Sequence, residues 1–173
     1  ELVRGMKITD YCDEKKLSTR ERLDLFIQVC QAIQHAHQKG IIHRDIKPDN
    51  VILEGTLGKA LLMDFGIAKT TQDFGMTVSG AIVGTPTYMS PEQATGDAYV
   101  DHRSDIYSLG VLAYHMLTGR PPFVGKTPHA VIASHVTEDP EPIRRINPSV
   151  PWVMADLVER CMAKNPDERI QSA

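Results

Sequence analysis

The chain has 173 residues, of which 42% are hydrophobic and 24% charged, and its formal net charge at pH 7 is −3. These values are close to globular averages and argue against a disordered chain, and the slight acidity argues against a nucleic-acid-binding protein, which is usually basic. No run of 18 apolar residues is present, so the sequence predicts no membrane-spanning segment in this chain. Its three cysteines lack C-x-x-C spacing and are typical of reduced thiols in a cytoplasmic protein.

A short extended segment that ends at Gly5 is the first expected element, and the first helix is expected over residues 17–40. Ser18 and Glu21 have the spacing of a capping box at the start of this helix, and Gly40 is the residue expected just beyond its end. Apolar residues follow an i, i+3, i+4 pattern in between, which predicts a face packed in the core: Leu23, Phe26, Ile27, Cys30 and Ile33.

Two short apolar runs, residues 51–53 and 59–63, flank a turn that contains two glycines. This pattern predicts a β-hairpin. The hairpin carries Asn50 at one end and Asp64 at the other, so pairing of its strands is expected to bring these two side chains close together.

The second half of the chain is expected to be mainly helical. Residues 67–92 are polar and rich in hydroxyls and predict a loop. A helix over 105–119 is apolar on most sides, which indicates that it is buried. Thr127 and Pro128 are residues of the kinds found at the N-cap and in the first turn of a helix, so a helix is expected to start there. A last helix is expected over about 151–164. The predicted fold is therefore mainly α with a small β-hairpin.

The most informative stretch is H-R-D-I-K-P-D-N at residues 43–50, followed by D-F-G at 64–66. Acidic and amide groups with a lysine on two short segments suit the binding of divalent cations and a polyphosphate. With S-P-E at 90–92, these motifs resemble the eukaryotic-type Ser/Thr protein kinases over the whole chain. S-P-E-Q-A at 90–94 and S-D-I-Y-S-L-G at 104–110 resemble the bacterial branch of that family.

The resemblance implies catalytic roles for five residues. Asp45 would accept or orient the proton of an incoming Ser or Thr hydroxyl of a protein substrate. Lys47 would contact the transferring phosphate, and a lysine at this position favours Ser/Thr over Tyr specificity. Asn50 and Asp64 would bind the Mg²⁺ (or Mn²⁺) ions that bridge the phosphates of ATP. Thr85 resembles the threonine that bonds Asp45 and Lys47.

The resemblance implies that two parts of the chain contact the adenine of ATP. One is the backbone at Glu1 and Val3, which would form the hinge between two lobes, and the other is the side chain of Ile52. From composition alone, a frayed terminus is nearly as good an interpretation of the first residues. Asp49 has two equally weighted interpretations: contact with a basic substrate side chain, or simple exposure to solvent.

The same resemblance implies regulation through Arg44, which would pair with a phosphorylated hydroxyl in the loop after D-F-G. Thr77 and Ser79 are the best-placed acceptors in that loop. Self-association of two copies for autophosphorylation is therefore an expected partner interaction, beside the protein substrate.

Five further residues are implied as structural. His43 and Phe65 would belong to an apolar stack that links the two lobes. Glu92 and Arg169 resemble an ion pair that ties the loop to the late helices. Asp105 is expected to cap the backbone of the turn that begins at His43.

The family's G-x-G-x-x-G loop and V-A-I-K lysine do not occur in the chain. We therefore expect residues 1–173 to be a partial kinase domain, the hinge plus the C-terminal lobe of the kinase α+β fold without the N-terminal lobe, and to be inactive alone. The alternatives are a non-catalytic binding or regulatory module and a small-molecule kinase of the same fold, against which the long loop to 90–92 argues. We expect no nucleic-acid partner, and the full-length protein can still be membrane-anchored.

Overall fold

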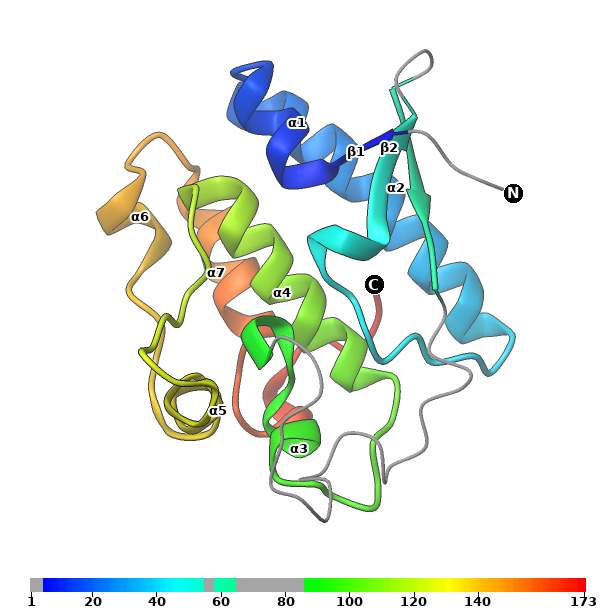
Figure 1. The fold of residues 1–173 in the computed structure, drawn as a ribbon, viewed down its shortest axis with the longest axis vertical. Coiled ribbons are helices and arrows are strands. Elements are labelled where there is room, and N and C mark those ends of the chain that lie inside the picture. The colour runs from blue at the N-terminus through cyan, green and yellow to red at the C-terminus, as the bar shows by residue number, and fades with distance from the viewer. Residues whose placement is uncertain (1–4, 55–57, 65–85) are drawn as a thin grey trace.

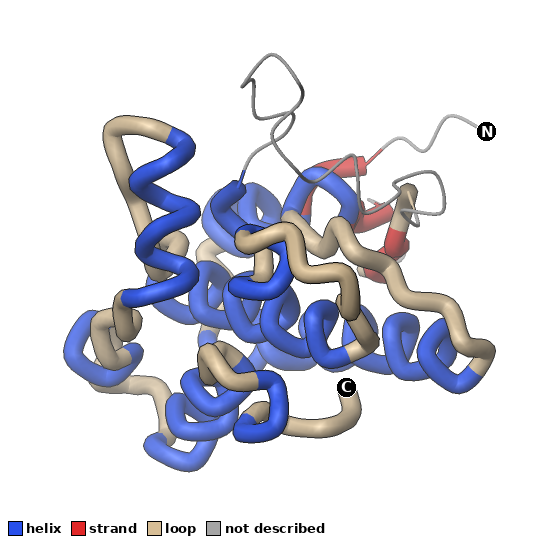
Figure 2. Tube along the Cα trace, turned by 90° about the horizontal axis from the view of Figure 1, so that it is seen from below, coloured by secondary structure: helices blue, strands red, loops and turns tan. Residues whose placement is uncertain are grey.

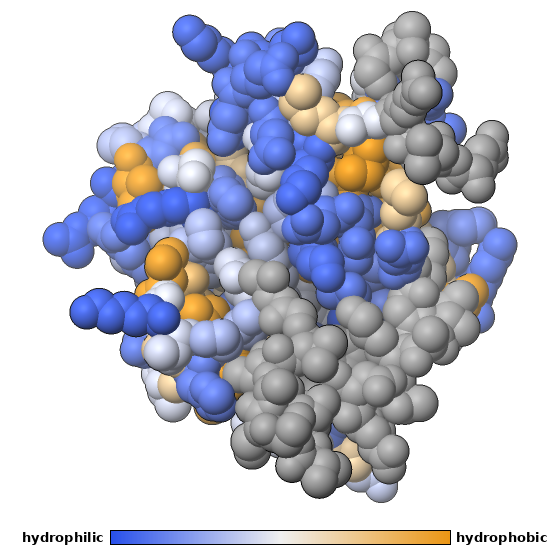
Figure 3. Space-filling view, in the orientation of Figure 1, coloured by the Kyte–Doolittle hydropathy of each residue, from blue (hydrophilic) through white to orange (hydrophobic). Residues whose placement is uncertain are grey.

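The computed structural model describes residues 5–54, 58–64 and 86–173. Figures 1 and 2 show a small sheet at one side of a body of helices. On the face drawn in Figure 3, the described residues are mostly hydrophilic, and hydrophobic atoms show only in small separate areas. Within these ranges, none of the helices combines the length and the apolar character that crossing a membrane requires.

The sheet has three antiparallel strands in the order β1 (Gly5–Lys7), β2 (Val51–Glu54) and β3 (Lys59–Leu62). The predicted hairpin of β2 and β3 is confirmed, whereas β1 was not predicted because three residues carry no readable alternation. Gly5 opens β1 rather than interrupting an extended segment. A Cβ atom at Gly5 would lie 2.5 Å from the Leu53 carbonyl oxygen, so glycine permits the close approach of β1 to β2.

Helix α1 (Ile8–Glu14) follows β1 directly, and the long helix α2 (Thr19–Gln38) comes next. The capping box of α2 is confirmed: the Ser18 amide donates to Glu21 Oε2 at 2.8 Å, and the Glu21 amide donates to Ser18 Oγ at 3.4 Å. The predicted buried face is only partly right, because Ile27 is 50% exposed. The residues that α2 buries follow a neighbouring stripe of the helix: Leu25, Val29, Ile33 and Ala36.

Helix α4 (Arg103–Thr118) runs through the centre of the body, and nearly all of its residues are buried, as predicted. It packs against α2 on one side and against α7 (Trp152–Cys161) on another. A Cβ atom at Gly110 would lie 2.8 Å from the Cβ of Cys161, so this glycine lets α4 and α7 approach closely. Helix α7 ends before the predicted residue 164, since Asn165 and Pro166 begin a new turn.

The remaining elements are short and surround α4. Thr127 caps helix α5 (Pro128–Thr137) as predicted, because its Oγ1 accepts a hydrogen bond of 3.2 Å from the Ala130 amide. The others are the helices α3 (Pro91–Ala94) and α6 (Ile143–Ile146) and the 3₁₀ turns η1 (Pro48–Asn50), η2 (Pro86–Tyr88) and η3 (Pro166–Glu168). The fold class is the predicted one, mainly α with a small sheet, which has three strands instead of two.

Candidate active site

Three side chains of the loop before β2 meet at one point. Lys47 Nζ donates to both carboxylate oxygens of Asp45, at 3.1 Å and 2.9 Å. Asn50 Nδ2 donates to the Asp45 carbonyl oxygen at 2.7 Å and to Asp45 Oδ2 at 3.2 Å. The side chains of Lys47 and Asp45 keep 21% and 20% of their surface exposed, so the cluster is positioned by the protein and still open to a ligand.

Asp64 lies at the same end of the sheet. The Met63 amide donates to the Asn50 carbonyl oxygen at 2.8 Å, which continues the pairing of β2 and β3 by one step. Asp64 is the next residue and is exposed, with a φ of 53° in the left-handed region. The hairpin thus brings Asp64 to the loop that holds Asn50, as the sequence predicted from their places at the two strand ends.

Asp105 of α4 holds the turn that precedes this cluster. Its Oδ2 accepts from the His43 amide and its Oδ1 from the Arg44 amide, both at 2.8 Å, and the carboxylate is 1% exposed. This is the contact that the sequence predicted for Asp105. Sequence reasoning missed His37, whose Nε2 contacts Asp105 Oδ2 at 2.7 Å, because helical spacing carries no signal for a contact with a residue 68 positions away.

The ring of His43 links the loop to the backbone of Met63, the residue before Asp64. His43 is fully buried, and its burial lowers the pKa of the imidazole. Its Nδ1 accepts from the Asp45 amide at 3.3 Å, so its Nε2 carries the proton and donates to the Met63 carbonyl oxygen at 3.0 Å. A neutral ring of one tautomer therefore ties the backbone of Asp45 to the residue before Asp64.

The other wall of the site comes from α3 and η2. Gln93 Nε2 donates to the Arg44 carbonyl oxygen at 2.8 Å. A cavity of about 20 Å³, enough for roughly one water molecule, lies between the loop and this wall, lined by Arg44, Asp45, Ile46, Lys47, Tyr88, Met89 and Gln93. Arg44 Nε is buried and has no hydrogen-bond partner among the described residues.

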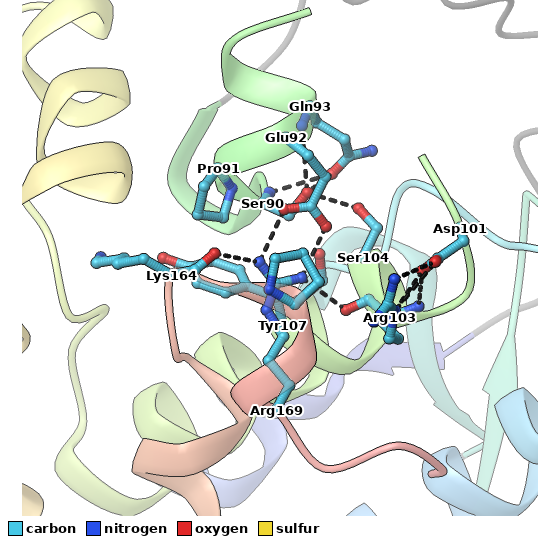
Figure 4. A network of polar contacts seen from close by, with 12 residues as sticks. Ser90, Pro91, Glu92, Gln93, Asp101, Arg103, Ser104, Tyr107, Lys164 and Arg169 are labelled. Atoms are coloured by element: carbon cyan, nitrogen blue, oxygen red, sulfur yellow. Dashed lines mark hydrogen bonds and ion pairs between the residues drawn. The ribbon is translucent and has the colours of Figure 1, made fainter. Parts of the chain in front are cut away.

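Figure 4 shows the ion pair that fixes α3 to the end of the chain. Arg169 Nη1 and Nη2 donate to Glu92 Oε1 and Oε2 at 2.7 Å and 2.8 Å, in a bidentate arrangement. The two side chains are 0% and 10% exposed, and Arg169 also donates to the carbonyl oxygens of Arg103, Ala163 and Lys164. The predicted pair of Glu92 and Arg169 is confirmed, and it is buried.

Six predicted site residues lie outside the described ranges: Glu1, Val3, Phe65, Thr77, Ser79 and Thr85. Ile52 is partly buried in β2, where it pairs with Lys7 and Leu61. Asp49 is exposed, as one of its two interpretations expected, and forms an ion pair of 2.6 Å with Lys7. Its contact with a basic substrate side chain stays a prediction.

Comparison with known proteins gives one consistent family. The protein kinase domain matches residues 1–173. Serine/threonine-protein kinase PknB of Mycolicibacterium smegmatis is 43% identical over all of this chain and 28% of its own length, and PknB of Mycobacterium tuberculosis (strain H37Rv) is 42% identical over the same shares. The probable serine/threonine-protein kinase SCO3848 of Streptomyces coelicolor is 46% identical over 92% of this chain and 24% of its own length. The chain thus spans less than a third of the length of each relative.

Proposed function

The chain belongs to the protein kinase domain family, and we propose that the whole protein is a serine/threonine kinase that transfers the γ-phosphate of ATP to Ser or Thr hydroxyls of proteins. The observation that supports this most directly is the meeting of Asp45, Lys47 and Asn50 within hydrogen-bond distance. Residues 1–173 would supply the hinge and the C-terminal lobe, with the rest of the nucleotide site supplied by chain outside these residues.

In this function Asp45 orients the hydroxyl that attacks the phosphate and accepts its proton. Asn50 holds the backbone and one carboxylate oxygen of Asp45, which fixes the direction of that carboxylate. Lys47 places a positive charge beside Asp45, where it offsets the negative charge that grows on the transferring phosphate.

The residues present fit a Mg²⁺ ion, or Mn²⁺. The amide nitrogen of Asn50 is used by Asp45, so its oxygen is the atom that can act as a ligand. The exposed Asp64 would supply the second oxygen ligand, since the residue before it is hydrogen-bonded to the Asn50 backbone. Mg²⁺ prefers oxygen ligands and takes few of them from the protein when phosphates supply the rest. Held there with ATP, the ion would supply positive charge that offsets the charge of the phosphates. Ile52 and the backbone at Glu1 and Val3 would face the adenine.

The same proposal includes a mode of regulation, an association between two copies and a cellular location. Arg44, whose Nε is buried without a described partner, would bind a phosphate on Thr77 or Ser79, and Thr85 would contact Asp45. Two copies of the protein would associate to phosphorylate each other at those hydroxyls.

Because ATP is the phosphate donor, we propose that this domain lies in the cytoplasm, with any membrane anchor outside residues 1–173.

The test is phosphorylation of a Ser/Thr peptide library by the full-length protein with ATP and Mg²⁺. Asp45→Asn keeps the shape of the side chain and removes the base, so turnover should fall by about a hundredfold or more. Asp156→Asn, the same change at an exposed position of α7, should leave turnover unchanged. Purified residues 1–173 alone should show little or no activity.

Three results would count against the proposal. Full turnover by Asp45→Asn would remove the base assignment, and robust phosphorylation by residues 1–173 alone would contradict the incomplete nucleotide site. A full-length protein that binds ATP and Mg²⁺ but phosphorylates no peptide would favour the alternative of a non-catalytic regulatory module.

A further inference from the structure

The backbone of η2 is held by side chains from α4 and α5. His135 Nε2 contacts the Thr87 carbonyl oxygen at 3.0 Å. Ser108 Oγ donates to the Tyr88 carbonyl oxygen at 2.7 Å, and the Tyr88 hydroxyl contacts His115 Nδ1 at 2.7 Å. The contact from His135 comes from α5, an element that contributes no residue to the cluster around Asp45.

The hydrogen-bond role of His135 follows from its neighbours. A carbonyl oxygen can only accept, so Nε2 must carry the proton that binds Thr87. Nδ1 then accepts from the Tyr107 hydroxyl at 2.9 Å, which is a better contact than the 3.5 Å from that hydroxyl to the His135 carbonyl oxygen. His135 is fully buried, and this burial lowers the pKa of the ring to about 4, so the ring is neutral at pH 7.

His135 itself is fixed from two further directions. Lys164 Nζ donates to its carbonyl oxygen at 2.9 Å and lies 4.6 Å from the centre of the Phe123 ring. The same Phe123 ring meets the imidazole edge to face, with the ring centres 4.9 Å apart. Lys164 and Tyr107 lie beside Arg169 in the network of Figure 4, so His135 joins η2 to the buried network that also holds α3.

The position of η2 matters for the site because Tyr88 and Met89 line the cavity that Asp45 and Lys47 also line. The Met89 amide donates to the Pro86 carbonyl oxygen at 3.1 Å, so a shift of Thr87 would move this wall with it. Asp45, the residue proposed to orient the acceptor hydroxyl, therefore lies across a space of about one water molecule from this wall.

We infer that His135 is a positioning residue for the protein substrate: through the carbonyl oxygen of Thr87 it fixes the wall along which the acceptor peptide binds. The inference rests on the proposed kinase function. A merely structural role would lower stability without a selective effect on peptide binding, and this difference makes the inference testable.

The experiment compares two variants of the full-length protein. His135→Phe keeps an aromatic ring against Phe123 and removes both nitrogens, whereas His135→Gln can place its amide nitrogen where Nε2 lies and still donate to Thr87. For His135→Phe we expect the KM for peptide to rise about tenfold, the factor that ~1.4 kcal/mol gives, with the KM for ATP unchanged. His135→Gln should restore the wild-type KM for peptide. Hydrogen exchange of the segment 86–89 should accelerate in the Phe variant only.

Each other outcome overturns the inference. An unchanged KM for peptide in His135→Phe would show that the wall does not guide the substrate, and unchanged exchange at 86–89 would show that His135 does not hold it. An equal rise in both variants would show that the hydrogen bond to Thr87, which only His135→Gln can keep, does not set the KM for peptide. If the Phe variant does not fold, His135→Asn, which is too short to reach Thr87, replaces it. Absence of peptide phosphorylation by the wild type would contradict the proposed function instead, and the exchange measurement still decides whether His135 holds η2.

Discussion

Arg44 is kept in a left-handed backbone conformation by Asp105. The φ of Arg44 is 66°, and its amide donates to Asp105 Oδ1 at 2.8 Å. Asp105 lies 61 positions later in the chain. Such a conformation costs a non-glycine residue roughly 1–2 kcal/mol, so the turn needs a partner that compensates it. Asp64 also has a positive φ, so the two segments that carry the proposed chemistry are both backbone outliers.

The first prediction concerns this turn. Asp105 accepts from two amides and faces His37 Nε2, and Asp105→Asn would replace one acceptor oxygen by a donor nitrogen. We expect the free energy of unfolding to fall by about 1–3 kcal/mol, because a buried donor loses its acceptor. Urea unfolding of the variant measures this, with Asp156→Asn as the exposed control. An unfolding midpoint equal to that of the control would show that the carboxylate does not hold the turn.

The second prediction concerns the pair of Glu92 and Arg169. Glu92→Gln leaves Arg169 as a buried charge without its carboxylate, which should cost about 3–5 kcal/mol of stability. The pair of Arg103 and Asp167, in which the Asp167 side chain is 81% exposed, serves as the comparison, and Asp167→Asn should change stability by less than about 1 kcal/mol. Both variants are compared by urea unfolding at pH 7. Equal effects would mean that burial does not set the contribution of the first pair.

The motifs of the sequence were sufficient to select Asp45, Lys47 and Asn50, which the structure brings together, and to give the contact of Asp105 with the turn 62 positions earlier. Local patterns were sufficient for the capping box of α2 and the hairpin. They failed for Ile27, which is half exposed, since one apolar stripe cannot tell which side of a helix faces a neighbouring helix. His135 was missed because its partner is a backbone carbonyl 48 residues away, which no side-chain pattern marks.

The third prediction concerns pH. Burial lowers the pKa of His135 from 6.5 to about 4, so between these values the unfolded chain binds a proton that the folded chain does not. The contribution of His135 to the free energy of unfolding is therefore complete above about pH 6.5. It is lost as the pH falls towards 4, by up to about 3 kcal/mol. Burial lowers the pKa values of His43 and His115 as well, which gives the same sign.

The variant His135→Gln cannot titrate at this position, so it separates the pH effect of His135 from that of the other histidines. The free energy of unfolding is measured for both proteins at several pH values between 7 and 4.5. The wild type should lose more stability than the variant over this range. Parallel curves would show that His135 is as easily protonated in the folded state as in the unfolded chain.

The fourth prediction concerns Asn50 in the full-length protein. Asn50→Asp keeps the size of the side chain but replaces the nitrogen that donates to the Asp45 carbonyl oxygen at 2.7 Å and to Asp45 Oδ2 at 3.2 Å. A second carboxylate would repel Asp45, so kcat should fall by about a hundredfold or more. Because the added charge also attracts cations, raising the Mg²⁺ concentration should recover part of the lost kcat, whereas Asp45→Asn should gain nothing. Measuring kcat at increasing Mg²⁺ concentrations distinguishes Asn50→Asp from Asp45→Asn. Identical Mg²⁺ curves for the two variants would contradict the proposed placement of Asn50 between Asp45 and the metal.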